Sequence, residues 1–390
     1  MHDVAVIGVG MMGAAALRYL AEAGVDVVGV GPAEPADRTA HTGVFASHYD
    51  EGRITRVLDP EPVWGELGAR AIAAYADIEA RSGVRFHYPA GCLRVSDDTS
   101  DPGCTLNAVE AWGCAHDVAF DALDAGALRE RFPFLRFGDA ARGLDERGAA
   151  GYINPRALVR AQLTLATAAG APLVRAEVQE VARDGDVFVV SGPAFDDIRA
   201  RRVLIATGAW GNELLPRPVE LSPRAVGVVL AEVDETEAAR LAAMPSIIYR
   251  FPGDPALVSI YALPPIRYPD GKTYVKIGGT LREPIPLRGR DALNAWFHGD
   301  GNPVENAATE AVLRRMIPGL AARTIRTVAC TVTYTGHNRP YVDEVAPGMF
   351  VALGGCGAAA KSSDAIGRLA ADLLRGVADP LHDACAAVVR

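Results

Sequence analysis

The side chains with the clearest chemical potential lie near the C-terminal end of this 390-residue chain. Cys330 stands in a strand-like run, residues 328–335, and a glycine-rich turn at 354–357 then leads into a helix that carries Lys361. A thiol can act as a nucleophile, and a lysine in the first turn of a helix is unfavourable for the helix dipole unless an anion lies nearby. The alternatives are a small core residue for Cys330 and an ordinary helix-start lysine.

A second glycine-rich turn lies at the other end of the chain. Gly8, Gly10 and Gly13 follow an apolar strand at residues 3–7 and open a helix predicted over 12–23. Glycines at this spacing permit a tight turn and let backbone N–H groups approach a pyrophosphate at a helix N-terminus. We therefore predict an adenine dinucleotide cofactor. The second glycine turn, with its Cys and Lys, favours a flavin over a nicotinamide.

The usual acidic ligand of the ribose is missing from the predicted second strand, residues 25–30. Asp or Glu should end this strand, but Gly31 stands there, and Glu34 and Asp37 follow a few residues later. Either these acids reach back to the ribose, or a backbone group or water replaces them.

Polar and ionisable groups are concentrated in residues 47–56 (SHYDEGRITR). Arg53 and Arg56 are three residues apart and could present one face to a cofactor phosphate or a substrate carboxylate, which a planar guanidinium binds in bidentate fashion. A solvated surface segment with routine ion pairs is the alternative.

Two further candidates are ambiguous from pattern alone. Lys276 alternates with apolar residues in the strand-like run 274–278, a pattern typical of a solvent-facing lysine. Tyr261 is more often a packing residue than a catalytic one. A functional role for either residue depends on the resemblance described below.

The order of predicted elements indicates a mixed fold, α/β and α+β, with two domains. A Rossmann-like cofactor-binding domain is assembled from separated segments, and the prolines and alternating apolar pattern of 217–300 predict a mostly antiparallel sheet in a substrate domain. Shorter predictions include a helix over 62–82, a strand over 87–95, a helix over 152–169 and strands over 202–207 and 349–353. The expected division is 1–85, 145–215 and 321–390 for the first domain, and 86–144 and 216–320 for the second.

Composition excludes several classes of protein. The net charge of −9 and isoelectric point near 5.5 argue against a nucleic-acid partner. Six cysteines show neither a C-x-x-C pair nor a Cys/His metal spacing, and no apolar run approaches the ~20 residues that span a bilayer. No secretory signal is evident. We expect a reduced, cytoplasmic, monomeric protein with no metal and no membrane partner.

Taken in order, seven short stretches resemble the monomeric sarcosine oxidase and N-methyltryptophan oxidase branch of the D-amino-acid-oxidase-like flavoenzymes. They extend over essentially the whole chain, and each is weak alone but specific in this order. The stretches are GVGMMG at 8–13, SHYDEGRITR at 47–56, NPR at 154–156, ATGAW at 206–210, YVKIGG at 274–279, the Cys330 segment, and GGCGAAAKSS at 354–363.

The resemblance implies a role for each candidate. Cys330 falls where the family attaches FAD through a thioether to the 8α-carbon, with Cys356 as the rival attachment point. Arg56 and Lys361 fall where the substrate carboxylate is held, and Lys276 where a lysine assists the reaction of reduced flavin with oxygen. The remaining implied site residues are Arg53 near the flavin face, Tyr261 and Tyr49 in the substrate pocket, and Gly8, Gly10, Met11, Met12, Gly13, Ser47, His48, Thr207, Gly208, Trp210, Gly355, Cys356 and Gly357 at the cofactor.

The implied activity is oxidation of a C–N bond in a secondary, N-methyl or cyclic amino acid to an imine, with oxygen reduced to hydrogen peroxide. The departures from the family pattern fall mainly in the substrate pocket, where Tyr49, Thr280 and Ala358 replace histidines and Val332 replaces an aromatic residue. Sarcosine itself is therefore a doubtful substrate. A flavin dehydrogenase of the same fold, with another acceptor or a 2-hydroxy acid substrate, remains an alternative, as does a cofactor-binding subunit without turnover.

Overall fold

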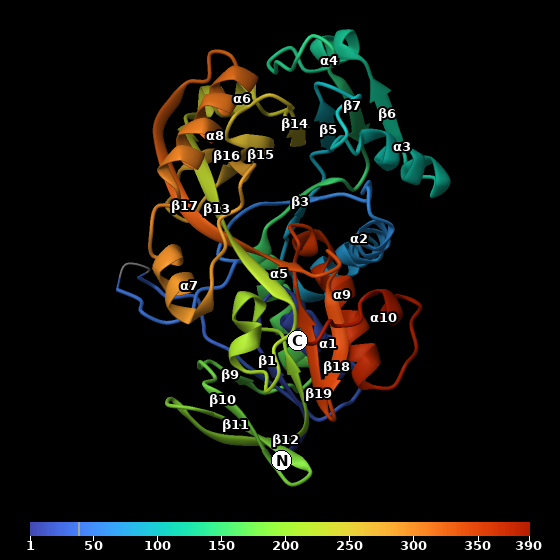
Figure 1. Ribbon diagram of the computed structural model, residues 1–390, viewed down its shortest axis with the longest axis vertical. Helices are drawn as coiled ribbons and strands as arrows, with labels where there is room; N and C mark the ends of the chain where they lie inside the picture. Colours follow the sequence, from blue (N-terminus) through green and yellow to red (C-terminus); the bar gives the residue numbers. More distant parts are fainter. Residues whose placement is uncertain (38–39) are drawn as a thin grey trace.

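The computed structural model describes residues 1–37 and 40–390, and two eight-stranded sheets lie at opposite ends of the molecule (Figure 1). A three-stranded sheet of β3 (Arg53–Thr55), β8 (Gly151–Ile153) and β4 (His87–Tyr88) is a separate element. The predicted mixed α/β architecture is confirmed. No helix within the described residues is both long enough and apolar enough to cross a bilayer.

The first sheet joins both ends of the chain. Strand β1 pairs in parallel with β2 on one side and with β12 on the other, and β12 also pairs in parallel with the C-terminal strand β19. The sheet is thus assembled from separated segments. Its strands are β1 (His2–Ile7), β2 (Val27–Val30), β9 (Leu173–Val174), β10 (Glu180–Asp184), β11 (Val187–Gly192), β12 (Phe195–Ile205), β18 (Tyr341–Ala346) and β19 (Met349–Leu353).

Four helices share one hydrophobic core with a face of this sheet. Val4 and Val6 of β1 point into that core, whereas Ala5 and Ile7 point to the opposite face, as the two-residue period of a strand requires. The helices are α1 (Met11–Glu22), α2 (Pro62–Ser82), α5 (Pro155–Ala168) and α9 (Ala359–Leu374). The N-terminal and C-terminal helices α1 and α9 are in contact.

The second sheet has the order β17-β13-β16-β15-β14-β5-β7-β6 and is antiparallel except where β14 pairs with β5. One of its faces packs against α4 (Ala125–Arg131) and α8 (Pro303–Met316). Its strands are β5 (Cys92–Ser96), β6 (Phe120–Leu123), β7 (Arg142–Glu146), β13 (Leu221–Val233), β14 (Ser246–Arg250), β15 (Leu257–Arg267), β16 (Thr273–Leu281) and β17 (Ala322–Thr335). The remaining helices are α3 (Leu106–Ala115), η1 (Gly208–Glu213), α6 (Glu235–Arg240), α7 (Gly289–Phe297) and α10 (Leu381–Ala384).

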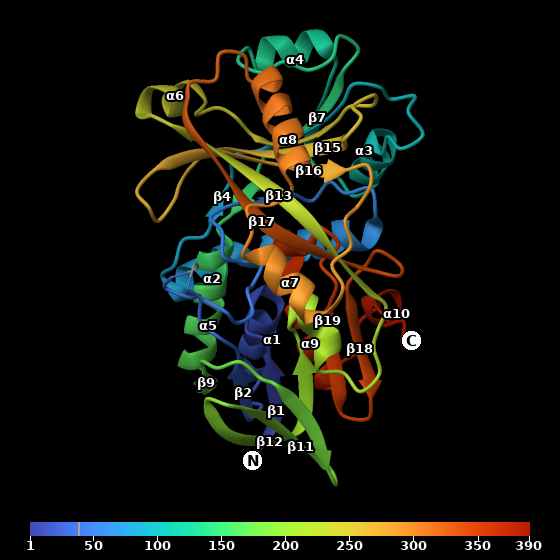
Figure 2. The ribbon, with the colours of Figure 1, turned by 60° about the vertical axis from the view of Figure 1, so that its left-hand side comes forward.

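Two long strands extend from the second sheet toward the first. Figure 2 shows β13 and β17 side by side along this direction, and they pair from Leu221 to Val233. The expected division placed residues 321–335 in the cofactor domain, whereas β17 pairs with β13 in the second sheet. The division into domains remains a prediction.

Two local predictions were wrong. Residues 87–95 do not form one strand, because Pro89 and Gly91, which has a φ of +82°, interrupt the chain between β4 and β5. The helix predicted over 152–169 begins only at Pro155. Residues before it form β8, and the Asn154 side chain caps the helix by accepting a hydrogen bond from the Ala157 N–H at 2.9 Å.

Candidate functional site

One face of the second sheet carries three of the predicted site residues. Tyr261 of β15 lies opposite Gly278 of β16, and Lys276 comes two residues earlier in the same strand. Cys330 lies on the same face, two strands away in β17. Because paired residues and residues two apart share a face, all three side chains point away from α4 and α8.

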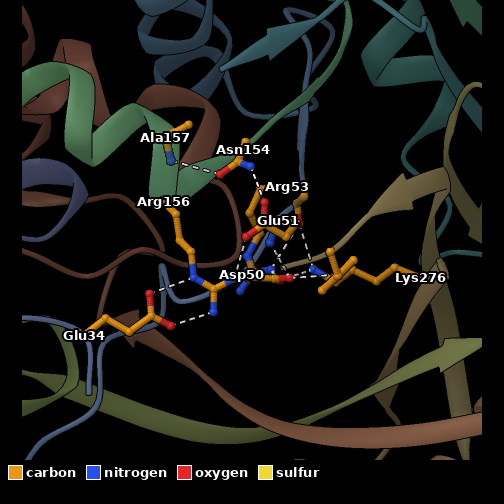
Figure 3. Close-up of polar contacts among 10 residues, drawn as sticks. Glu34, Asp50, Glu51, Arg53, Asn154, Arg156, Ala157 and Lys276 are labelled. Carbon is orange, nitrogen blue, oxygen red and sulfur yellow. Dashed lines mark hydrogen bonds and ion pairs between the residues drawn. The ribbon is translucent and has the colours of Figure 1, made fainter. Parts of the chain in front are cut away.

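Lys276 lies at the centre of a buried polar cluster. Its side chain is 0% exposed, its Nζ donates a hydrogen bond to the Gly52 carbonyl at 2.7 Å, and it forms an ion pair with Asp50. Arg53 also pairs with Asp50, and its Nη2 donates to the Cys330 Sγ at 3.6 Å. Figure 3 shows Arg53 and Lys276 converging on Asp50. The solvent-facing interpretation of Lys276 is wrong, because this face of the sheet is covered too.

The charge state of Lys276 is set by competing neighbours. Burial lowers the pKa of Lys276 well below its ordinary value, and the positive charge of Arg53 lowers this pKa further. Cys330 opposes both effects on this pKa, and the Asp50 carboxylate contacts the ammonium directly. Asp50 also accepts a hydrogen bond from the Tyr268 hydroxyl at 2.9 Å.

A cavity of about 260 Å³ opens beside this cluster. Its lining includes Ser47, Tyr49, Asp50, Arg53 and Cys330. The segment 47–56 is therefore part of a concave site together with the thiol, and the solvated-surface interpretation of this segment is wrong.

Tyr261 packs closely over the strand that carries Lys276. A Cβ atom at Gly278 would lie 2.4 Å from the Tyr261 ring, so only glycine leaves room for the ring there. The Lys276 Nζ lies 5.4 Å from the centre of the same ring, within cation–π range. Burial raises the pKa of Tyr261 to about 12, so its hydroxyl stays protonated at neutral pH.

A second charged cluster forms around Asp59. The Arg56 Nη2 donates to the Asp59 carboxylate at 2.9 Å, and the Lys361 Nζ lies 3.6 Å from the same oxygen and donates to the Trp64 carbonyl at 2.5 Å. Burial would raise the pKa of Asp59, but Lys361 and Arg56 outweigh it, and the net shift is downward. The structure thus brings Arg56 and Lys361 together and supplies Lys361 with the anionic partner expected at a helix start.

The ionisation of Lys361 gives a testable pH dependence. Burial lowers its pKa to about 8 from 10.5, Asp59 opposes the shift, and Arg56 adds to it. Between these two values the unfolded chain binds a proton that the folded chain has released. The unfolding free energy of the wild type, measured relative to Lys361→Met, should therefore rise with pH in this window, by at most about 1.4 kcal/mol per pH unit.

Urea unfolding of the wild type and Lys361→Met at half-unit pH steps measures this difference. We expect a difference that is flat below about pH 8 and shifts in favour of the wild type above it. A difference that stays flat up to pH 10 would mean that Lys361 titrates like an exposed lysine.

The N-terminal glycine turn has the geometry of a phosphate cradle. A Cβ atom at Gly13 would lie 1.9 Å from the Gly8 carbonyl oxygen, and Gly8 has a φ of +91°. Helix α1 begins at Met11 and Met12 with no side chain capping it, so its first N–H groups are free for an anion. The residues present therefore fit the pyrophosphate of FAD.

Other predicted cofactor residues lie around this turn. The His48 Nδ1 is 3.6 Å from the position of a Cβ atom on Gly10, and burial, aided by Arg156 and Arg53, lowers the pKa of His48 to about 3. Thr207 follows β12 beside Gly8, and its Oγ1 is buried without a partner among the described residues. A buried hydroxyl of this kind fits a bound polar ligand.

The C-terminal turn lies close to the end of β17. Gly355, Cys356 and Gly357 precede α9, and the Cys356 N–H donates to the Thr333 carbonyl of β17 at 2.9 Å. Burial raises the pKa of the Cys356 thiol, and Cys356 does not line the cavity that Cys330 lines. This geometry favours Cys330 over Cys356 as the attachment point. Gly208 and Trp210 lie in η1, and Trp210 donates through its indole N–H to the Phe45 carbonyl at 3.2 Å.

Glu34, one of the two acids that could reach back to the ribose, is bound to other residues. Glu34 forms a bidentate pair with Arg156, at 2.7 and 2.6 Å, and Arg156 also binds Glu51 at 2.6 Å (Figure 3). A Cβ atom at residue 31 would lie 2.9 Å from the Val9 backbone nitrogen, which accounts for Gly31 at the strand end. Of the two alternatives at the ribose, this geometry favours a backbone group or water over Glu34.

Several residues of the site were not predicted from the sequence. Asp50 and Asp59 each lie three residues from the arginine that they bind, and this spacing was a signal that could have found them. Arg94 and Glu146 also lie at the second cluster, and Glu146 accepts hydrogen bonds from Val57 and Leu58 N–H groups at 2.8 and 2.9 Å. The one sequence signal for Arg94 was a charged residue between apolar residues of the strand β5.

Comparison with known proteins agrees with this geometry. A family model described as DAO, FAD dependent oxidoreductase, matches residues 3–373. Monomeric sarcosine oxidase of Streptomyces avermitilis is 31% identical over 219 residues, 55% of this chain and 53% of that protein. N-methyl-L-tryptophan oxidase of Escherichia coli is 27% identical over 227 residues, 56% and 57% of the two chains. The matches span about half the length of these relatives.

Among solved structures, NikD, an unusual amino acid oxidase essential for nikkomycin biosynthesis, superposes with a TM-score of 0.80. The identity is 20%, over 100% of this chain and 98% of that one, so the likeness concerns the fold. Fold and site together define an FAD-dependent oxidoreductase. The chain belongs to the DAO family of FAD dependent oxidoreductases, which confirms the family predicted from its motifs. No cluster of metal-binding side chains occurs in residues 1–37 and 40–390.

Proposed function

We propose that this protein is an FAD-dependent amine oxidase that converts a secondary, N-methyl or cyclic amino acid to an imine and passes the electrons to oxygen. The observation that carries the proposal is the common face of Cys330, Lys276 and Tyr261, which the segment around Gly52 covers. Farther along that segment, Arg56 meets Lys361 at Asp59. The names of the two curated relatives, both oxidases, support the same reaction class.

The chain's own residues bind and orient the substrate. The positively charged second cluster, which contains Arg56 and Lys361, holds the carboxylate, and this fixes the direction of the α-carbon. The substrate nitrogen is neutral when it reacts, because its lone pair must assist loss of the C–H hydride. FAD, when bound, supplies the electron acceptor for that hydride.

Lys276 and Arg53 provide positive charge on the same sheet face as the thiol. Such charge stabilises the anion that develops when oxygen takes the first electron. Asp50 neutralises part of it, and this pairing favours one alternative, a dehydrogenase that uses another acceptor. The amount of peroxide formed per substrate oxidised separates the two functions.

Anaerobic mixing of the purified flavoprotein with N-methyl, cyclic and D-amino acids tests the amine assignment. We expect at least one secondary or cyclic amino acid to bleach the flavin absorbance, followed by stoichiometric peroxide when oxygen is admitted. Bleaching by 2-hydroxy acids alone would remove the amine assignment. Bleaching by an amine without peroxide would select the dehydrogenase.

The proposed covalent bond between Cys330 and FAD can be tested by the colour of the acid-precipitated protein. A thioether from the Cys330 Sγ to the 8α-carbon replaces one S–H and one C–H bond by a C–S bond, and oxygen accepts the two electrons released. Cys330→Ala should yield a colourless precipitate after acid denaturation, whereas Cys356→Ala, the matched control, should yield a yellow one. A yellow precipitate from Cys330→Ala would show that this sulfur is not the attachment point.

Two further predictions concern the location of the protein in the cell and its assembly state. A cytoplasmic location and a monomeric state are expected from the composition and resemblance. Size-exclusion chromatography with light scattering measures the assembly state directly.

A further inference from the structure

Arg94 lies on the same face of the second sheet as the candidate catalytic residues. It pairs with Leu144 of β7 and with Ile248 of β14, and Ile248 in turn pairs with Tyr261. Paired residues share a face, so Arg94 and Tyr261 point to the same side, two strands apart. Nothing in the motif pattern of the chain assigns Arg94 a role.

The Arg94 guanidinium has donors to spare. Its Nε is buried and has no hydrogen-bond acceptor in the part of the chain that the structure describes. The Nε of Arg56 is likewise buried and has no acceptor among these residues. Buried donors are ordinarily paired, so two unpaired guanidinium N–H groups in one cluster indicate a missing acceptor. Both arginine side chains remain partly exposed, with Arg56 at 12%.

The charges around Arg94 also indicate that an anion is missing from this cluster. Burial lowers the pKa of Arg94 to about 10, repulsion from Arg56 adds to this effect, and Asp59 opposes it. Asp59 is a single carboxylate already bound by Arg56 and approached by Lys361. The Glu146 carboxylate is occupied by two backbone N–H groups. An additional anion would relieve the repulsion between the two arginines.

Lys361 is poorly placed to be the main partner of that anion. Its side chain is only 1% exposed, its ammonium donates to the Trp64 carbonyl, and its ion-pair partner is Asp59. A ligand that enters from solvent meets the guanidinium groups of Arg56 and Arg94 more readily than this buried ammonium.

We propose that Arg94 and Arg56 together form the binding site for the substrate carboxylate, with Lys361 serving mainly to hold Asp59. This inference rests on the proposed function, since it concerns the substrate of that reaction. It makes Arg94 a specificity-determining residue on β5, and it places the carboxylate at the β5 side of Tyr261. Amino acids and other amines with a carboxylate are the class of ligand that this pair selects.

Calorimetric titration of the purified flavoprotein with two probes tests the inference without turnover. Cyclopentanecarboxylate presents the anion on a ring like that of a cyclic amino acid, and cyclopentanecarboxamide is its neutral counterpart. Arg94→Gln should weaken carboxylate binding at least tenfold and leave carboxamide binding unchanged, because charge-assisted hydrogen bonds are lost. Arg250→Gln is the matched control, since Arg250 is partly buried in the same sheet but is paired with Asp101.

Lys361→Met should weaken carboxylate binding less than Arg94→Gln does. The inference is overturned if Arg94→Gln binds the carboxylate as tightly as the wild type, or if it loses affinity equally for both probes. Should Arg94→Gln fail to fold, Arg94→Lys decides: carboxylate binding weakened more than about threefold supports the inference, because lysine lacks the planar fork, and unchanged binding overturns it. The two claims can fail separately. If carboxylate binding does not depend on Arg94 but the protein oxidises amines, the inference fails and the proposed function stands. If carboxylate binding depends on Arg94 but no amine is oxidised, the proposed function fails and the carboxylate site stands.

Discussion

Replacing Lys276 by methionine is expected to slow the reaction of the reduced enzyme with oxygen by about two to three orders of magnitude. The lysine is fully buried on the sheet face that also carries Cys330, and no water can substitute for its charge as oxygen accepts the first electron. The rate of anaerobic flavin reduction by substrate should change much less. Stopped-flow mixing of substrate-reduced enzyme with oxygenated buffer measures the effect.

The control for this variant is Lys272→Met. Lys272 directly precedes β16, the strand that carries Lys276, but its side chain is 49% exposed and is paired with Glu232. The control variant should react with oxygen at the wild-type rate. Lys276→Met also leaves Asp50 with one cation fewer, so the double variant Asp50→Asn, Lys276→Met should recover stability without recovering oxygen reactivity. Equal oxygen rates in wild type and Lys276→Met would remove Lys276 from the proposed mechanism.

The second large effect is expected at the N-terminal glycine turn. Gly13→Ala should abolish FAD binding and destabilise the fold, because its Cβ atom would lie 1.9 Å from the Gly8 carbonyl oxygen. The backbone at the start of α1 would have to move, and the cradle for the pyrophosphate would be lost. Flavin content per protein and the thermal unfolding midpoint of the apoprotein measure the two consequences.

Gly10→Ala separates cofactor binding from folding. A Cβ atom there would make only ordinary contact with the His48 ring, whose nearest atom, Nδ1, lies at 3.6 Å, and the backbone of Gly10 has an extended conformation that alanine adopts. The apoprotein should therefore unfold like the wild type, yet bind FAD weakly, since the added methyl group blocks close approach of the phosphate. Full flavin content in Gly10→Ala would contradict the proposed place of the pyrophosphate.

Local sequence signals were sufficient where one residue decides an element boundary. Helix α2 was predicted at its observed bounds from the helical spacing of its apolar residues. In the structure, Pro62 suits the first helical turn and Gly83 ends the helix with a φ of +67°. The Glu61 side chain accepts a hydrogen bond from the Trp64 N–H at 3.1 Å and caps the helix. The helix predicted over 152–169 shows the limit of such signals, since apolar periodicity did not reveal that Asn154 caps it.

The site was less accessible to local reasoning because it depends on which sheet faces are covered. Alternation in residues 274–278 predicted a lysine in solvent, whereas the packing of residues 50–52 against this face places Lys276 in the interior. Arg94 gave no motif signal, since its importance comes from Arg56, a neighbour 38 positions earlier in sequence that lies beside it in space. The order of motifs along the chain supplied most of the site residues.

A crystal structure of the flavin-loaded protein tests the central claim most directly. We expect the isoalloxazine ring to lie against the face that carries Tyr261 and Lys276, bonded to Cys330, with the FAD pyrophosphate at the start of α1. A ring bound away from that face, with the sulfur of Cys330 and the cations of the second cluster both remote from it, would contradict the account.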